Sequence, residues 1–273
     1  MDSTIVLVYC LCDDLLKWQK HREDVQCHLS DAEVMTIGLV AALYFDGNHS
    51  LSALFLTEQG YMGRQLSRSR LCRRLQRVRV HYAALFAILG EFFKAQNQEQ
   101  LYLLDSMPVA VCDPYRIRRC RIYRMECYRG YQASKKRWVY GLKIHLMVTK
   151  DGEPVEFFLT PAASSDTACL LSYNFDLPPG AQIFADKAYN YGLAEDLLEE
   201  YGIDLSPIRK SNSKRPDPPW LRYLQAYHRK RIETTNSQVE HLLPKHIHAV
   251  TAAGFETKVA LFVLATSINC LTC

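Results

Sequence analysis

The sequence predicts an α/β protein with a mixed central sheet, preceded by an α-helical N-terminal domain. Two observations support this prediction. Up to about residue 95, apolar residues recur at helical spacing. From Glu99 onward, short apolar runs typical of strands alternate with amphipathic stretches. We therefore expect a helical domain over 1–95, with a DNA-binding role, and an α/β catalytic domain over 96–273.

The composition is that of a folded globular protein. Of the 273 residues, 48% are apolar and 23% are charged, which excludes a disordered tail or a fibrous repeat. The ten cysteines do not form two pairs with zinc-ligand spacing, and no signal segment precedes them, so we expect reduced thiols in the cytoplasm. The apolar run Val259–Ala265 is too short to span a bilayer, and we expect it to be a core helix without membrane contact.

Two helix starts are marked in the N-terminal region. Ser30 and Glu33 have the spacing of a capping box, which predicts a helix from about Asp31. A longer helix is expected from about Ser67. Its apolar stripe consists of Leu71, Leu75, Val78, Tyr82, Leu85, Leu89 and Phe92.

The first half of this second helix is strongly basic. Seven arginines lie between Arg64 and Arg79, and no acidic residue accompanies them. A solvated helix face is the ordinary explanation of such charge. However, without acidic partners the arginines repel one another unless an anion neutralises them. We therefore expect DNA contacts here, from Arg70, Arg73, Arg74 and Arg77.

The region after Glu99 predicts the elements of the sheet. Leu101–Asp105 is a short strand that ends in an acid, and a second strand is expected to pair beside it after a turn at Pro108. The remaining expected elements are strands over 140–149 and 155–159 that form a hairpin, a helix from Ser165 to about Tyr173, a strand over 181–186, a helix over 192–201, a strand over 203–208 and a long helix from about Trp220.

Two basic loops interrupt this pattern, over 113–137 and 209–219. The first holds nine Lys or Arg residues against two acids. Four tyrosines are interleaved with them, at positions 115, 123, 128 and 131. Such a surface suits contacts with a phosphate backbone and stacking on bases. We expect Arg119, Arg121 and Lys136 to contact DNA.

Three acids carry the chemical hypothesis. Asp105 and Asp186 each follow an apolar strand, and Glu233 follows a basic run on the last long helix. Each acid alone is more often a turn or helix-cap residue. Together, three carboxylates converging from two strands and a helix are suited to hold two Mg²⁺ ions for phosphoryl transfer.

The segments around these acids resemble the three acidic motifs of DDE transposases of bacterial insertion sequences. They are Leu104-Asp105-Ser106-Met107-Pro108, Ala185-Asp186-Lys187-Ala188-Tyr189-Asn190 and Arg229-Lys230-Arg231-Ile232-Glu233. The chain is most similar to the insertion-sequence 982 family, within the wider insertion-sequence 4-like group. The resemblance extends from Leu66-Ser67-Arg68-Ser69-Arg70 to Ile247-His248-Ala249-Val250-Thr251.

The resemblance implies an RNase H-like fold with Asp105, Asp186 and Glu233 as catalytic and metal-binding residues. It implies two Mg²⁺ ions, for which Mn²⁺ is expected to substitute, and contacts to substrate DNA by Lys187 and Arg229. The expected activity is cleavage of double-stranded DNA at the element ends and strand transfer into target DNA. The resemblance also implies a bacterial protein located in the cytoplasm, which forms a homodimer when it is bound to DNA. Ala188 departs from the Gly that many relatives have.

Several alternatives stay open at this point. Glu240 lies seven residues after Glu233 and projects from the same helical face, so it competes as the third ligand. Asp166 is either a helix-start acid or a further ligand, and His145 is expected to be a structural histidine. The same residues also suit a metal-dependent nuclease that does not join strands, or an inactive DNA-binding product of the element.

Overall fold

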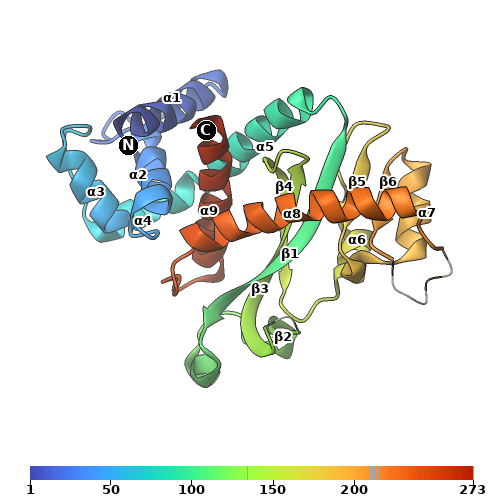
Figure 1. Cartoon of the computed structure of the whole chain (residues 1–273). Coiled ribbons are helices and arrows are strands. Elements are labelled where there is room, and N and C mark those ends of the chain that lie inside the picture. The colour runs from blue at the N-terminus through green and yellow to red at the C-terminus, as the bar shows by residue number, and fades with distance from the viewer. Residues whose placement is uncertain (134, 210–212, 214, 273) are drawn as a thin grey trace. The chain divides into compact units, whose positions relative to one another are not determined.

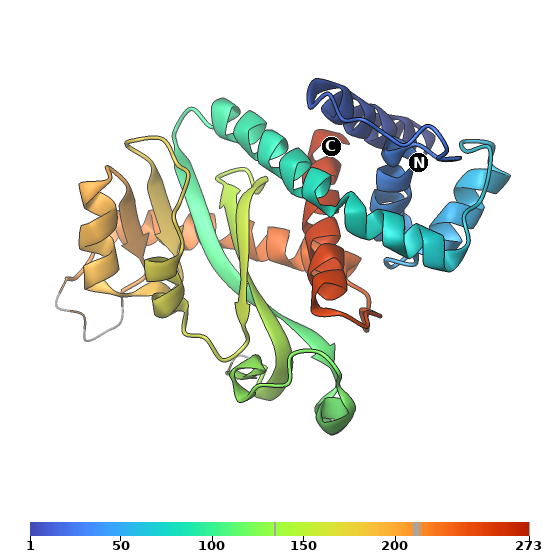
Figure 2. The same cartoon turned by 180° about the vertical axis from the view of Figure 1, so that it is seen from behind.

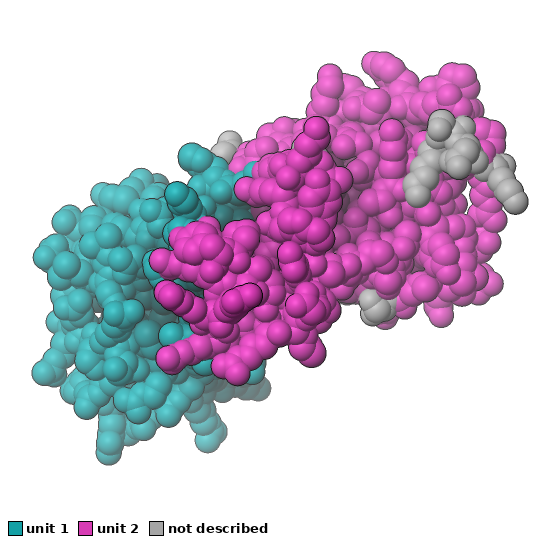
Figure 3. Space-filling view, turned by 90° about the horizontal axis from the view of Figure 1, so that it is seen from below, with its two compact units in different colours: residues 1–89, 239–273 teal, residues 90–238 magenta. Residues whose placement is uncertain are grey.

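The computed structural model describes residues 1–133, 135–209, 213 and 215–272. Parts of both predicted basic loops, residues 134, 210–212 and 214, therefore lie outside the described residues. The chain forms two compact units, shown in different colours in Figure 3. The first unit comprises Met1–Leu89 and Val239–Cys273, and the second comprises Gly90–Gln238.

The first unit is helical. Its elements are α1 (Asp2–Trp18), α2 (Asp31–Tyr44), α3 (His49–Glu58), α4 (Arg68–Arg77), the first part of α5 (Arg79–Gln96), the end of α8 (Pro219–Leu242) and α9 (Ala252–Thr272). The predicted capping box is confirmed at α2. Ser30 Oγ accepts a hydrogen bond from the Glu33 backbone N–H (3.1 Å), and the Ser30 N–H donates to Glu33 Oε2 (2.6 Å).

The prediction of a single long helix from Ser67 is wrong in one respect. The segment is divided at Val78 into α4 and α5. Val78 and Val80 are β-branched and lie among arginines, which weakens the helix locally. The apolar stripe is buried from Leu71 to Leu89, but it continues through Phe93. Phe92, the residue we expected there, is 47% exposed.

α9 contains the predicted core segment Val259–Ala265. Within the described residues it is the one helix whose length and apolar composition suffice to cross a membrane. Its inner residues are buried in the unit, including Val259, Phe262 and Ile268. A buried core helix has the same length and composition, so this feature agrees with the predicted core helix.

The second unit is built on a six-stranded mixed sheet (Figure 1). The strands are β1 (Leu101–Cys112), β2 (Arg129–Gln132), β3 (Arg137–Thr149), β4 (Pro154–Pro161), β5 (Gln182–Ala185) and β6 (Asp204–Pro207). Their order is β2-β3-β1-β5-β6, and β4 also pairs with β3. β1 to β4 pair antiparallel, whereas β5 and β6 run parallel to β1. The predicted α/β class with a mixed sheet is therefore confirmed.

β1 corrects the expected turn at Pro108. The strand continues through the proline to Cys112, so the two predicted short strands are one. β1 pairs with β5 only from Leu101 to Leu104, and among the described strands its later residues pair with β3 alone. Pro108 lacks a backbone N–H, and a strand tolerates this where one edge is unpaired.

Helices lie on both faces of the sheet. α8 crosses one face, while α6 (Asp166–Ser172) and α7 (Gly192–Glu200) lie on the other (Figures 1 and 2). On the α8 face, Thr235 Oγ1 donates to the Gly152 carbonyl (2.9 Å) in the β3–β4 turn. The predicted hairpin, the helix capped by Ser165 and the helix at 192–201 are confirmed.

Candidate active site

The register of the sheet brings two acids side by side. β1 and β5 run parallel, and Leu104 pairs with Ala185. Asp105 directly follows Leu104, and Asp186 directly follows Ala185. The two acids therefore lie next to each other where the parallel pairing stops. Asp105 does not end its strand, contrary to our expectation, because β1 continues past it. Asp186 follows β5 and precedes the short 3-10 helix η3 (Lys187–Tyr189).

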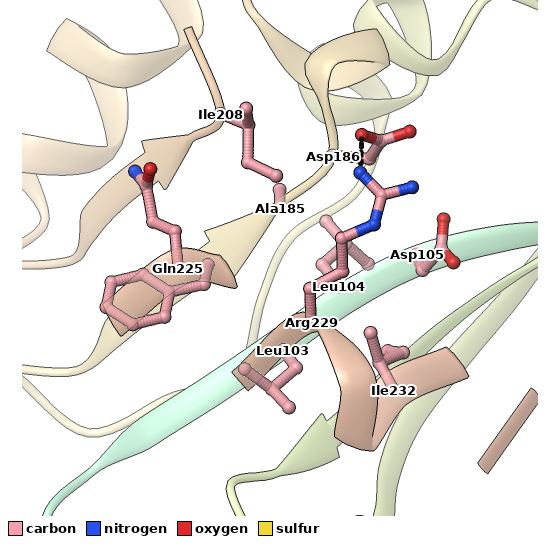
Figure 4. A pocket seen from close by; sticks show the side chains of 10 residues that line it. Leu103, Leu104, Asp105, Ala185, Asp186, Ile208, Gln225, Arg229 and Ile232 are labelled. Atoms are coloured by element: carbon pink, nitrogen blue, oxygen red, sulfur yellow. Dashed lines mark hydrogen bonds and ion pairs between the residues drawn. The ribbon is translucent and has the colours of Figure 1, made fainter. Parts of the chain in front are cut away.

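α8 presents a row of polar side chains to these acids. Arg229 donates from Nη1 to Asp186 Oδ1 (2.7 Å) and from Nε to Glu233 Oε1 (2.7 Å). Asn236 Nδ2 donates to Asp105 Oδ2 (2.9 Å). The three residues have i, i+4 and i+7 spacing, which is one face of a helix. Figure 4 shows Arg229 reaching from the helix to Asp186, with Asp105 on the adjacent strand.

Arg229 acts as a cationic bridge at this site. Its guanidinium contacts Asp186 and Glu233. The hydrogen bond to Glu233 foremost, and then the negative charge of Asp186, raise the pKa of Arg229. The bridge is open to solvent, since the Arg229 side chain is 42% exposed and that of Glu233 is 55% exposed. Arg229, Asp105 and Asp186 also line a pocket whose remaining walls are mainly apolar.

Asn236 was not among the site residues predicted from the sequence. Besides donating to Asp105, it holds a buried Oδ1 that has no hydrogen-bond partner. An orphaned buried oxygen beside a carboxylate is an open position for a water, an ion or another donor. Its spacing from Arg229 and Glu233 places it on the same helix face, but this became informative only once Asp105 was known to lie opposite.

A second polar cluster lies beside Asp105. Asp166, at the start of α6, accepts hydrogen bonds from Lys143 Nζ (2.9 Å) and Ser106 Oγ (3.2 Å). Lys143 Nζ also donates to the Ser164 carbonyl. Asp166 is therefore both the helix-start acid and an ion-pair partner. Burial raises the pKa of Asp105 most, followed by the charge of Asp186. The charge of Asp166 raises it further by a smaller amount.

The structural interpretation of His145 is confirmed. The ring is fully buried, shares hydrogen bonds with Tyr189 OH (2.8 Å) and Thr160 Oγ1 (3.0 Å), and stacks on Phe158. Burial lowers the pKa of His145 to about 4, so the ring is neutral at pH 7. Tyr189 in turn fixes η3, which leaves Lys187 exposed beside Asp186.

Asp105 is held in an unfavourable electrostatic environment. Burial is the main cause that raises its pKa to about 6, and the Asp186 charge adds to it. The Ser106 N–H and the Arg229 charge act in the opposite direction but do not cancel the effect. A divalent cation held by these two aspartates would favour their charged forms, because it would supply positive charge where two carboxylates lie side by side.

Replacing Asp105 by asparagine is expected to stabilise the metal-free protein. The folded-state pKa is about 6 and the ordinary value is 3.8, so the penalty is present above pH 6 and vanishes below pH 3.8. Asp105→Asn should raise the free energy of unfolding by ~1–3 kcal/mol at pH 8 and leave it unchanged near pH ~3.5. Urea unfolding with a chelator present measures this difference in the free energy of unfolding.

Asp196→Asn is the matched control, since Asp196 is exposed. Equal stabilities of the wild type and Asp105→Asn at pH 8 would contradict the account.

The donors around the two aspartates fit a hard divalent cation. Asp105, Asp186 and Glu233 offer carboxylate oxygens, and Asn236 offers its orphaned amide oxygen. In the structure the Arg229 guanidinium occupies the position between Asp186 and Glu233. Among the described residues, three ligand atoms lie within 4.8 Å of one another only at His21, Glu23 and Asp31 in the first unit.

The His21 cluster does not need a metal to balance its charge. Asp31 accepts a hydrogen bond from Arg74 Nη2 (2.6 Å) and shares another with His21 Nε2 (2.8 Å). Glu23 accepts the Asp31 backbone N–H. The Arg74 guanidinium therefore already supplies the cation at this position.

The four arginines expected to contact DNA in the first unit differ in their surroundings. All of them line a second pocket, together with Gln26, Cys27, His28 and Leu66. Arg70, Arg73 and Arg77 are exposed. Arg74 has a side chain that is only 12% exposed, and it also donates to the Leu29 carbonyl. Arg74 thus has a structural partner in the unit, whereas the other three present charge to solvent.

The other expected contact residues are on the surface of the second unit. Arg119 ends the 3-10 helix η1 (Pro114–Arg119), and Arg121 follows it. Lys136 lies in the turn between β2 and β3, and all three side chains are exposed. Glu240, the alternative third ligand, is exposed and belongs to the part of α8 in the first unit.

The comparison with protein families agrees with this geometry. Residues 95–248, more than half of the chain, match the family model described as Transposase DDE domain. The matched segment contains Asp105, Asp186, Arg229, Glu233 and Asn236. No curated protein and no solved structure matches the chain.

Proposed function

The chain belongs to the DDE transposase family, and on this premise we propose that it cleaves DNA at the ends of an insertion sequence and joins the freed 3′-OH to target DNA. The observation that carries the proposal is the pairing of Leu104 with Ala185, which makes Asp105 and Asp186 neighbours across two parallel strands. The strand order, with three antiparallel strands and two parallel ones around β1, supports an RNase H-like fold.

Asp105, Asp186 and Glu233 would hold two Mg²⁺ ions, with Mn²⁺ as a substitute. Bound there, the ions supply a Lewis acid that activates the attacking water or 3′-OH and stabilises the leaving oxygen. Asn236 keeps the Asp105 carboxylate in place through its Nδ2 hydrogen bond. Its free Oδ1 is suited to accept a hydrogen bond from a water molecule in the site.

Arg229 has two functions in this proposal. Without substrate it neutralises Asp186 and Glu233 and keeps them near each other. Because its side chain is 42% exposed, a DNA phosphate can compete for the same guanidinium, whose fork suits two oxygens. The arginine then orients the phosphate beside the acids that it has released.

DNA binding would fall to the exposed arginines of α4, to the basic segment 113–137, and to Lys187 beside the acids. The 1–95 region would act as the DNA-binding domain, and two copies of the chain would hold two element ends in the cytoplasm. We further propose membership of the insertion-sequence 982 family. The acidless run Arg64–Arg79 and the nine basic residues of 113–137 support a polyanionic partner.

The contrast between Arg73 and Arg74 gives a testable prediction. Arg73→Ala should weaken DNA binding and lower the salt dependence, with the log Kd against log [salt] slope falling by about 1, because one phosphate contact is lost. Fluorescence anisotropy at several salt concentrations measures the slope. Arg74→Ala should instead lower the thermal stability, since it removes the Asp31 ion pair. An unchanged slope for Arg73→Ala would contradict a DNA contact on this helix.

The experiment that tests the function uses DNA carrying the element ends. Mg²⁺-dependent nicking at the element boundary is expected, and a pre-cleaved end should be joined to a target plasmid. Nicking without joining would support a nuclease in place of a transposase. DNA binding without either reaction would support an inactive element product.

A further inference from the structure

A group of exposed side chains on the β2–β3 hairpin lies outside the acidic site. Tyr131 pairs directly with Trp138 across the two strands. Arg129 is two residues before Tyr131, so the alternation of the strand puts it on the same face. The Tyr131 and Trp138 ring centroids are 5.2 Å apart, and the Arg129 guanidinium lies 4.8 Å from the Trp138 ring centroid. We call these three residues the Trp138 platform.

The Trp138 platform faces solvent. Trp138 is 50% exposed and Tyr131 is 54% exposed. The next aromatic residue on the same face of β3, Tyr140, is by contrast only 4% exposed. Tyrosine and tryptophan are enriched at binding surfaces, and aromatic rings beside basic residues form the stacking surface of proteins that bind single-stranded nucleic acids.

The four tyrosines of the first basic segment divide into two groups in the structure. Tyr123 and Tyr128 contact each other, with ring centroids 4.6 Å apart, and both are half-buried. Tyr131 and Tyr115 are exposed. Of the four, Tyr131 is the one that joins a tryptophan and an arginine on one strand face. The sequence alone gave no basis for choosing among them.

The charge around the Trp138 platform favours a nucleic acid over an apolar or acidic protein surface. The segment 113–137 has nine basic and two acidic residues. Arg137, next to Trp138, is exposed, and its Nε donates to Gln132 Oε1 across the hairpin. Lys136 is exposed in the adjoining turn. Basic groups that can bind phosphates and aromatic rings that can stack on a base therefore lie within a few residues of one another.

We propose that the Trp138 platform binds an unpaired nucleobase of DNA by stacking. Bases within a duplex have both faces covered by their neighbours, so a ring on the protein surface reaches a base face only at a single strand, an overhang or an opened end. The Trp138 indole or the Arg129 guanidinium supplies the stacking surface, and the flanking basic residues contact the phosphates. This inference rests on the proposed function, since it presumes that DNA is the substrate.

The test compares three labelled DNAs by fluorescence anisotropy in the presence of a chelator, which removes metal-dependent chemistry. They are a single strand, a blunt duplex, and the same duplex with a single-stranded overhang. Trp138→Ala should weaken binding of the single strand and of the overhang about tenfold, and binding of the blunt duplex by less than about twofold. Trp138→Phe should retain most of the binding to the single strand, because it keeps an aromatic ring.

A matched control is Tyr201→Ala. Tyr201 is 76% exposed but follows Glu199 and Glu200, so its loss removes a comparable exposed ring from an acidic surface. This variant should bind all three DNAs like the wild type. Circular dichroism and thermal unfolding verify that Trp138→Ala remains folded. Should the alanine variant unfold, Trp138→Thr removes the ring without adding charge and keeps a β-branched residue suited to the strand, and it is expected to show the same selective loss.

Two results would overturn the inference: an unchanged affinity of a folded Trp138 variant for the single strand, or an equal loss on the single strand and on the blunt duplex. Neither result affects the proposed function, provided that the wild type binds duplex DNA. A wild-type protein that binds none of the three DNAs would instead overturn both the proposed function and the inference.

Discussion

Asp105→Asn and Asp186→Asn are each expected to abolish DNA cleavage and strand transfer, with a loss of roughly a thousandfold or more. Each substitution replaces a charged metal ligand by a neutral amide of the same shape. The two residues lie next to each other beyond the Leu104–Ala185 pair, so loss of either removes one of the two adjacent carboxylates proposed to hold the cations. Nicking and joining assays with element-end DNA and Mg²⁺ measure the loss.

DNA binding should change little in both variants, within about twofold, because the expected phosphate contacts lie elsewhere. Asp196→Asn serves as the matched control, since it removes an exposed carboxylate that pairs with Arg215. That variant should cleave like the wild type. Activity that persists in either aspartate variant would contradict the assignment of the catalytic acids.

Arg229→Ala is expected to slow cleavage about a hundredfold at saturating Mg²⁺, because a cationic donor to the reacting phosphate is lost. Mn²⁺ should bind at least as tightly as in the wild type, since the guanidinium no longer competes for Asp186 and Glu233. Arg229→Lys should be intermediate, because it keeps the charge but loses the two-pronged geometry. Single-turnover cleavage rates and Mn²⁺ titration by calorimetry separate these effects.

The neighbouring Lys230 offers a control on the same helix. It is exposed and lies one residue away, which turns it off the face that carries Arg229, Glu233 and Asn236. Lys230→Ala should leave the cleavage rate within about threefold of the wild type. If Arg229→Ala cleaves as fast as Lys230→Ala, or binds Mn²⁺ more weakly than the wild type, the proposed role of Arg229 is wrong.

Local signals in the sequence predicted most elements of the fold. The Ser30–Glu33 capping box and the turn around Gly152 define their elements through contacts between residues close in the chain. Pro108 misled the prediction, because a proline usually ends a strand unless one edge is unpaired. Which strand edge is unpaired depends on long-range pairing with β5, and this pairing leaves no local trace in the sequence.

The candidate site was predictable in its acids but not in their environment. All three acids lie in the motif segments, and Asp186 also follows a strand, whereas Asp105 lies within β1. Asn236 was missed, since an asparagine in a helix carries no signal of its own until the partner across the sheet is known. The Asp166–Lys143–Ser106 contacts likewise join three elements that are distant in sequence.

The central claim is that the fold gathers Asp105, Asp186 and Glu233 around divalent cations. A crystal structure of the protein with Mn²⁺, recorded at the manganese absorption edge, tests it most directly. The account predicts anomalous peaks at roughly 2.0–2.3 Å from oxygens of Asp105 and Asp186, with Glu233 as the third carboxylate and the Arg229 guanidinium displaced. Peaks confined to other positions, such as His21, Glu23 and Asp31, or Glu240 in place of Glu233, would contradict it.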